Sequence, residues 1–205
     1  KDCGRQFISV HEITYIGCLP WIAAMVSIML VRGIGIRDIS AVLRISIYKV
    51  LKVLKSYKRK IIPKLSRYDC LEIDEFWTYV GEKKKKMWLI YAYHRASGEI
   101  VAYVWGKRDI KTAQRLKRKI KRLGISYDRV ATDNWESFLS VFGNENNKEK
   151  HEVGKEHTVG IEGNNCRLRH RVRRVFRKTC CFSKNLFNHI KAFNMAFFYI
   201  NYGFV

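Results

Sequence analysis

The stretch "LEIDEFWTYV", from Leu71 to Val80, decides which fold the rest of the chain can adopt. Its β-branched and aromatic residues predict a strand. Polar turns connect it to two further predicted strands, "MWLIYAYHR" at 87–95 and "IVAYVWG" at 100–106. Because both connections are short, we expect the three strands to form an antiparallel meander.

Helices and one more strand follow this meander. "KTAQRLKRKIKRL" (111–123) has apolar residues at helical spacing up to Leu123, which predicts an amphipathic helix. A polar loop, "GNENNKEK" (143–150), comes later. The other predicted elements are a strand at 128–133 and helices at 134–142, 158–178 and 183–202. This order is the one expected of an α/β protein with a ribonuclease-H-like core over residues 70–205.

The segment 20–62 is predicted to be all helical and to form an N-terminal helix-turn-helix. Its two helices have these apolar residues on one face: Ile36, Ile39, Val42 and Leu43, then Ile47, Val50, Leu51 and Leu54. Ser46 is the expected N-cap of the second helix. The outward side of that helix carries Lys49, Lys52 and Lys55. The second helix of this motif lies in the DNA major groove, so the lysines are candidate DNA contacts. An ordinary helical hairpin with a solvated lysine face would have the same pattern.

The composition indicates a folded protein that binds a polyanion. The net charge is +22 over 205 residues, and 47% of the residues are hydrophobic, which is enough for a core. Nucleic acid is the first expected partner, before an anionic membrane surface or a ribosome-associated role. The uncharged stretch 13–31 is long enough to span a membrane. Pro20 shortens the predicted helix to the length of a buried core helix, so we expect no membrane partner.

The cysteines predict a reducing compartment. The six cysteines are scattered along the chain without any C-x-x-C pair. Such a pattern favours free thiols over a disulfide framework or a zinc site. No signal-peptide pattern stands out either, so we expect a cytoplasmic location.

Three acidic residues stand in places that suit a metal site. Asp74 lies in the middle of the first predicted strand, Asp133 ends the fourth, and Glu162 begins the basic segment 158–178. If the first and fourth strands are neighbours, Asp74 and Asp133 can lie side by side, with Glu162 brought over both by a helix. Cleavage of a phosphodiester is assisted by two divalent ions about 4 Å apart. Mg²⁺ prefers the oxygens that carboxylates supply.

Two of the three carboxylates have explanations that need no metal, whereas Asp74 is harder to explain without one. Glu162 suits a helix N-terminus, and Asp133 suits an N-cap. An acid in so apolar a strand is costly unless it is paired or metal-bound. However, Glu72 lies on the same face of the strand as Asp74, and Glu75 lies on the other. The alternation of the strand therefore does not choose among its three acids.

The basic segment supplies further candidate DNA contacts. Arg169 lies two turns from Glu162 on the same helix face, because a helix drifts only about 20° over seven residues. Asn165 lies on roughly the same face. The remaining candidate DNA contacts are Arg167, Arg173 and, close to Asp133 in sequence, Trp135.

Several blocks of the sequence resemble the DDE transposases of the insertion sequence 1 family. In order, they are "IDEFWTYVG", "WLIYAYHR", "VAYVWGKR", "TDNWESF", "HTVGIEGNNCRLRHRVRRVFRKT" and "CFSKN", all within residues 70–190. The resemblance implies a catalytic, metal-holding triad of Asp74, Asp133 and Glu162. It also favours Asp74 over its neighbours Glu72 and Glu75.

The family resemblance implies an activity and its requirements. The activity would be metal-dependent cleavage at the element's ends, followed by attack of the 3′-hydroxyl on target DNA. It implies two Mg²⁺ or Mn²⁺ ions, and a homodimer or larger assembly on DNA near the bacterial nucleoid. "KDCGRQF" resembles the tail of the family's zinc-binding segment, so residues 1–12 are expected to be a remnant that binds no zinc. Gly163 stands where the family usually has a larger polar residue, which would loosen the helix around Glu162.

Two other classes of function fit parts of the pattern. A helix-turn-helix regulator would bind DNA without chemistry, but it would have no use for three converging acids. A related nuclease would share the acids and would cut without joining. The spacing of the sequence does not separate this nuclease from a transposase.

Overall fold

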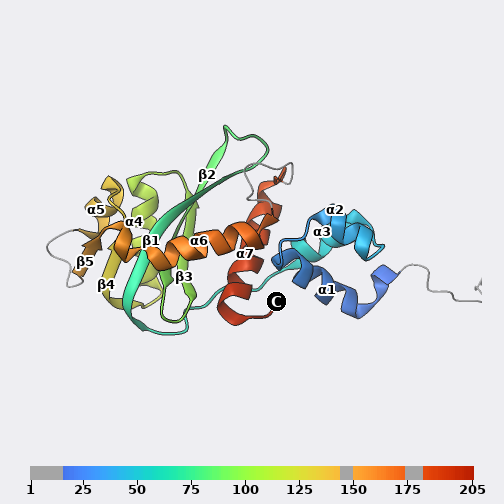
Figure 1. The fold of residues 1–205 in the computed structure, drawn as a ribbon, viewed down its shortest axis with the longest axis horizontal. Helices are drawn as coiled ribbons and strands as arrows, with labels where there is room; N and C mark the ends of the chain where they lie inside the picture. The colour runs from blue at the N-terminus through green and yellow to red at the C-terminus, as the bar shows by residue number, and fades with distance from the viewer. Residues whose placement is uncertain (1–15, 144–149, 174–181) are drawn as a thin grey trace, which may run out of the picture.

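A computed structural model describes residues 16–143, 150–173 and 182–205, whose strands form one mixed sheet with helices on both faces (Figure 1). The strands are β1 Arg67–Tyr79, β2 Lys86–His94, β3 Glu99–Gly106, β4 Ser126–Thr132 and β5 Lys150–Val153. The α-helices are α1 Pro20–Val31, α2 Ile36–Val42, α3 Ile47–Ser56, α4 Ile110–Arg122, α5 Glu136–Phe142, α6 Val159–Arg171 and α7 Leu186–Tyr202. Two 3-10 helices, η1 Ile16–Cys18 and η2 Lys155–His157, complete the described elements.

β1 is the central strand of the sheet. The strand order is β3-β2-β1-β4-β5, with β2 antiparallel and β4 parallel to β1. The predicted meander is therefore confirmed, and the first and fourth strands are neighbours, which was the condition for Asp74 and Asp133 to lie side by side. Leu71 and Ile73 enter the core beneath α4, while Phe76 enters the core beneath α6 and α7. Because both faces of β1 are covered, an acid within it is costly unless it is paired or hydrogen-bonded.

β5 was not expected from the sequence. The chain before it was interpreted as a polar loop over 143–150, and Lys150 in fact begins a strand that pairs in parallel with β4. A strand of four residues at the sheet edge has too few side chains to show an alternating pattern. Its hydrogen bonds come from β4, which the local sequence does not reveal.

The helices show one predicted N-cap and three exposed residues that were expected to be buried. Ser46 accepts a hydrogen bond from the backbone N–H of Lys49, so the predicted N-cap of α3 is confirmed. Val42, Ile47 and Leu123 were expected to face inward, and all three are exposed. Val42 and Ile47 lie at the ends of short helices, and Leu123 follows the last residue of α4, where the packed face has already ended.

The N-terminal helices pack against α7 at one end of the sheet (Figure 1). Val31 of α1, Leu54 of α3 and Met195 of α7 share one buried cluster. The segments 20–62 and 70–205, predicted as separate regions, thus meet through the C-terminal helix. Among the described helices, none has the length and apolar character needed to cross a membrane. The predicted remnant at 1–12 lies outside the described residues.

Candidate functional site

Three carboxylates meet where β4 ends beside β1. The register pairs Ile73 with Thr132, so the following residues, Asp74 and Asp133, come to the same level of the sheet. Together with Glu75 they each offer one carboxylate oxygen, and these oxygens lie within 4.8 Å of one another. The structure therefore brings together the two acids expected to be neighbours and adds Glu75 to them.

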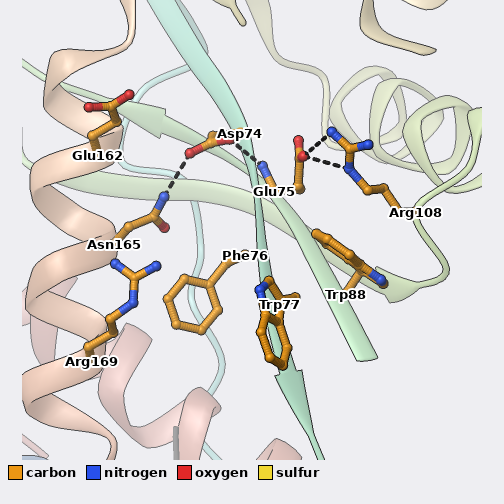
Figure 2. Close-up of a pocket in the computed structure, with 9 residues that line it drawn as sticks. All are labelled: Asp74, Glu75, Phe76, Trp77, Trp88, Arg108, Glu162, Asn165 and Arg169. Carbon is orange, nitrogen blue, oxygen red and sulfur yellow. Dashed lines mark hydrogen bonds and ion pairs between the residues drawn. The ribbon is translucent and has the colours of Figure 1, made fainter. Parts of the chain in front are cut away.

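A pocket of about 650 Å³ opens beside these carboxylates (Figure 2). Its lining residues are Asp74, Glu75, Phe76, Trp77, Trp88, Arg108, Glu162, Asn165 and Arg169. As expected, α6 presents Glu162, Asn165 and Arg169 on one face. Glu162 is exposed and faces the pocket across from Asp74, outside the group of three oxygens.

Burial in the pocket disfavours the charged forms of Asp74 and Glu75. Burial, together with the charges of Glu75 and Asp133, raises the pKa of Asp74 from 3.8 to about 7. Hydrogen bonds from the Glu75 N–H and the Asn165 amide offset part of this effect. Burial also raises the pKa of Glu75, against the opposite effect of Arg108. Acids that crowd together in this way are stabilised in their charged forms by a nearby cation.

The donor set fits a hard divalent cation. The ligand atoms of the three clustered residues are all carboxylate oxygens, which Mg²⁺ and similar ions prefer. Arg108 holds Glu75 Oε1, at 2.6 Å from Nη2 and 2.7 Å from Nε. Glu75 Oε2 is buried, and within the described part of the chain it has no hydrogen-bond partner. An oxygen left in this state is available to a cation.

Asp74 is held by a hydrogen-bonded chain that starts in the core. The Asn165 Nδ2 donates to Asp74 Oδ2 at 2.7 Å, and the Tyr91 hydroxyl donates to Asn165 Oδ1 at 2.8 Å. Burial raises the pKa of Tyr91 well above its usual value, so the hydroxyl keeps its proton. Tyr91 was not among the predicted site residues. Only its position directly opposite Asp74 in the β1–β2 register indicates this role, and the sequence does not specify that register.

Glu72, another acid of β1, holds the beginning of α6. Glu72 is 4% exposed, and its carboxylate accepts a hydrogen bond from the Ile161 N–H at 2.6 Å. Burial raises the pKa of Glu72, and this hydrogen bond lowers it. A Cβ on Gly160 would lie only 2.6 Å from Glu72 Oε1, so the close approach requires glycine. Glu72 thereby sets the place of α6, and with it the place of Glu162.

The remaining predicted DNA contacts lie partly at the pocket and partly elsewhere. Arg169 Cζ stands 4.9 Å from the centre of the Phe76 ring. Trp135 is half-buried, and Arg108 Cζ lies 4.6 Å from the centre of its ring. The others are dispersed: Arg167 is exposed on α6, Arg173 follows that helix, and α3 carries exposed Lys52 and Lys55 and half-buried Lys49. The α3 lysines do not line the carboxylate pocket.

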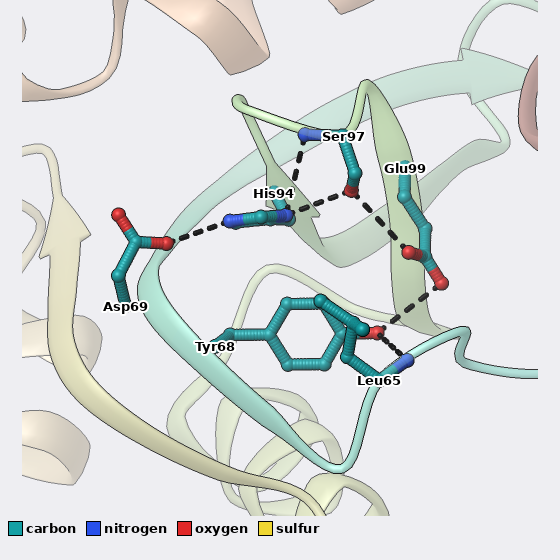
Figure 3. Close-up of polar contacts among 6 residues, drawn as sticks. All are labelled: Leu65, Tyr68, Asp69, His94, Ser97 and Glu99. Carbon is teal, nitrogen blue, oxygen red and sulfur yellow. Dashed lines mark hydrogen bonds and ion pairs between the residues drawn. The ribbon is translucent and has the colours of Figure 1, made fainter.

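A polar network at the opposite end of β1 includes an Asp–His–Ser sequence of contacts (Figure 3). His94 lies 2.7 Å from both Asp69 Oδ1 and Ser97 Oγ. The Ser97 hydroxyl also lies 3.3 Å from the carboxylate of buried Glu99, which in turn accepts from Tyr68. A carboxylate beside the serine would repel a developing oxyanion, whereas a serine hydrolase places hydrogen-bond donors there. The network therefore ties the β2–β3 hairpin to β1.

If the carboxylates hold a metal and cut DNA, as the family resemblance implies, replacing Tyr91 with Phe should lower cleavage about tenfold, as loss of an outer partner of a metal ligand does. Asn165 Oδ1 would lose its donor, and Asp74 would lose its fixed orientation. The cleavage rate is measured in a single turnover, and denaturant unfolding shows whether the stability of the fold has also changed. Tyr103→Phe is the matched control, because it removes a 2.8 Å hydrogen bond to Asn194 away from the carboxylates. Equal losses of cleavage in both variants would contradict the positioning role.

Replacing Gly163 with Ala is expected to stabilise the protein by about 0.5–1 kcal/mol, since glycine is a poor helix former. α6 runs unbroken through Gly163, and a Cβ there would meet nothing within 4 Å. The same substitution at Gly160 should destabilise, because its Cβ would collide with Glu72. Denaturant unfolding of both variants tests the opposite signs, and two changes of the same sign would refute this reading of the helix.

The sequence model of one protein family, described as IS1 transposase, matches residues 68–202. The chain belongs to the IS1 transposase family. Within this family, the insertion element iso-IS1n protein InsB of Shigella dysenteriae is 39% identical over 120 residues, covering 58% of this chain and 87% of that protein. The insertion element IS1 protein InsB of Shigella flexneri is 35% identical over 122 residues, covering 60% and 88%.

A solved structure is also similar to this member of the IS1 transposase family. It is the HTLV-2 integrase catalytic core domain in complex with magnesium, with a TM-score of 0.40 and 21% identity. The match covers 68% of this chain and 87% of that one.

Proposed function

We propose that this protein is a DNA transposase that cuts at the ends of an insertion element and joins the freed 3′-hydroxyl to target DNA. The meeting of Asp74 and Asp133 beside a pocket that Glu162 also lines is the observation that carries this proposal. Membership of the IS1 transposase family supports it. The strand order, with a meander followed by two parallel strands, supports a ribonuclease-H-like core over residues 70–205.

Asp74, Asp133 and Glu162 would hold two Mg²⁺ or Mn²⁺ ions. Bound divalent cations would favour formation of the attacking hydroxide or alkoxide and neutralise charge on the leaving oxygen. Asn165 and Tyr91 keep the Asp74 carboxylate in one orientation. The reaction needs no covalent intermediate on the protein, so no serine or tyrosine nucleophile is required.

Basic side chains would hold the DNA around this pocket. Arg169 and Arg108 line it and would pair with the phosphates next to the scissile bond, while half-buried Trp135 supports Arg108. Arg167 and Arg173 would extend this contact along and beyond α6. The helices of segment 20–62 would add a second DNA contact through Lys49, Lys52 and Lys55 of α3.

Transposition requires two element ends to be brought together, so the protein would act as a homodimer or larger assembly on DNA. A net charge of +22 suits such a partner. Because the substrate would be bacterial DNA, we place its action in the cytoplasm at the nucleoid.

A cleavage and joining assay tests this function. Supercoiled DNA that carries the element's own ends is incubated with the protein in Mg²⁺ or in chelator. Joined products that form only with the metal are expected. Cuts without joining would identify a nuclease, and tight binding with no cuts would leave only a DNA-binding protein.

A further inference from the structure

A second groove lies along the edge of the sheet, between β3 and α4. Its volume is about 640 Å³, and four cations line it: Arg115, Arg118, Lys119 and Arg122. The rest of its described lining is β3 residues 103–105, without any acid. Of the thirteen residues of α4, seven are Lys or Arg and none is acidic. The groove is therefore strongly positive.

Two of the four cations cover the free edge of β3. The Lys119 Nζ donates to the Tyr103 carbonyl at 2.8 Å, and Arg115 Nη1 donates to the Trp105 carbonyl at 3.1 Å. A peptide that added a strand to this edge would need the same carbonyls. The groove is thus poorly suited to strand addition. Its positive charge is the property that indicates what it binds.

The cations of α4 are close enough to repel one another. Arg118 and Arg122 are four residues apart, as are Arg115 and Lys119, and like charges at this spacing destabilise a helix. After burial, the positive charges of Arg122 and Lys60 lower the pKa of Lys119. The helix dipole favours cations only in the last turn, which does not account for Arg115. A bound polyanion would remove the repulsion along the whole row.

The position and length of the row suit a nucleic-acid backbone apart from the carboxylates. α4 packs over Ile73 on one face of the sheet, while Asp74 points to α6 on the other. From Arg115 to Arg122 the helix rises about 10 Å, at about 1.5 Å per residue. Over this length one strand of B-DNA presents about three phosphates.

We propose that the groove between β3 and α4 binds the phosphate backbone of target DNA at a distance from the phosphodiester that is attacked beside Asp74 and Asp133. The proposal rests on the proposed function, because joining requires a target duplex in addition to the element end. Contacts made to phosphates alone carry no sequence information, so this binding is independent of base sequence.

The test compares two variants that each lose two positive charges. Arg118→Gln/Arg122→Gln alters the groove, and Lys83→Gln/Lys84→Gln alters exposed residues in the β1–β2 turn. Binding of a duplex of random sequence is measured at several salt concentrations, with chelator present to prevent cleavage. Log affinity falls as log salt rises. We expect the groove variant to make this negative slope shallower by about two, and the turn variant to leave it unchanged.

Activity and stability provide separate readouts. In Mg²⁺, the groove variant is expected to cut element ends as the wild type does and to join them less. Its melting temperature should be unchanged or higher, because like charges are removed. Equal slopes in the two variants, or a groove variant that binds like the wild type, would overturn the proposal. A wild type that binds DNA without cutting it would count against the proposed function alone, since the slope comparison needs no chemistry.

Discussion

Asp133→Asn is expected to lower the rate of Mg²⁺-dependent DNA cleavage roughly a thousandfold, because the charge that would hold a cation at the reacting phosphate is lost. The fold should survive the change. Asp133 Oδ1 accepts a hydrogen bond from the Trp135 N–H at 3.2 Å, and an asparagine oxygen can accept the same bond. The rate is measured in a single turnover with enzyme in excess over labelled element ends.

The matched control is Asp128→Asn, on the strand that leads to Asp133. Asp128 lies on β4 and forms an exposed ion pair with Arg67 at 2.8 Å. Such surface pairs contribute only about 0–1 kcal/mol to stability. This control should cleave at the wild-type rate, and an Asp133→Asn protein that did the same would remove Asp133 from the reaction.

Two further substitutions decide which third carboxylate the reaction uses. Glu75 belongs to the group of oxygens within 4.8 Å, whereas Glu162 lines the pocket from α6. One Glu75 oxygen is already held by Arg108, so we expect Glu75→Gln to reduce cleavage less than Glu162→Gln does. The reverse order would show that Glu75, and not Glu162, completes the metal site.

Asp74→Asn is expected to stabilise the metal-free protein by roughly 2–4 kcal/mol at pH 8, at about 1.4 kcal/mol per pKa unit. The pKa of Asp74 is raised in the folded protein from 3.8 to about 7, mainly by burial. Between these values the unfolded chain releases its proton while the folded protein keeps it. The contribution of Asp74 to the free energy of unfolding is therefore fully present below about pH 4, is lost as the pH rises to about 7, and is absent above that pH. The variant lacks this loss.

Denaturant unfolding in chelator, at pH 8 and near pH 4, measures this difference. The two proteins should differ at pH 8 and converge near pH 4. Adding Mg²⁺ at pH 8 should stabilise the wild type and have little effect on the variant, because a ligand that binds the folded state raises stability. A wild type and variant with parallel pH profiles would show that Asp74 is charged at no cost in the folded protein.

The local sequence predicts most elements, and it places Asp74 within the first strand and Asp133 at the end of the fourth, as the structure does. Richness in β-branched and aromatic residues is a property of each strand alone, so the meander could be predicted before any pairing was known. The same is true of α6, whose period places Glu162 and Arg169 on one face. Short elements are the exception, since β5 and the exposed Val42 and Ile47 depend on partners that local patterns do not contain.

From the sequence alone came the basic character of the chain, its order of elements, and the positions of Asp74 and Asp133 on the first and fourth strands. Only the tertiary structure decided that Tyr91 reaches Asp74 through Asn165, that Glu75 joins the carboxylates, and that α4 forms a groove with β3. The physical reason is that strand register and helix placement are set by packing between residues far apart in the chain. Periodicity records which face of an element is buried, but it does not record which side chain lies opposite.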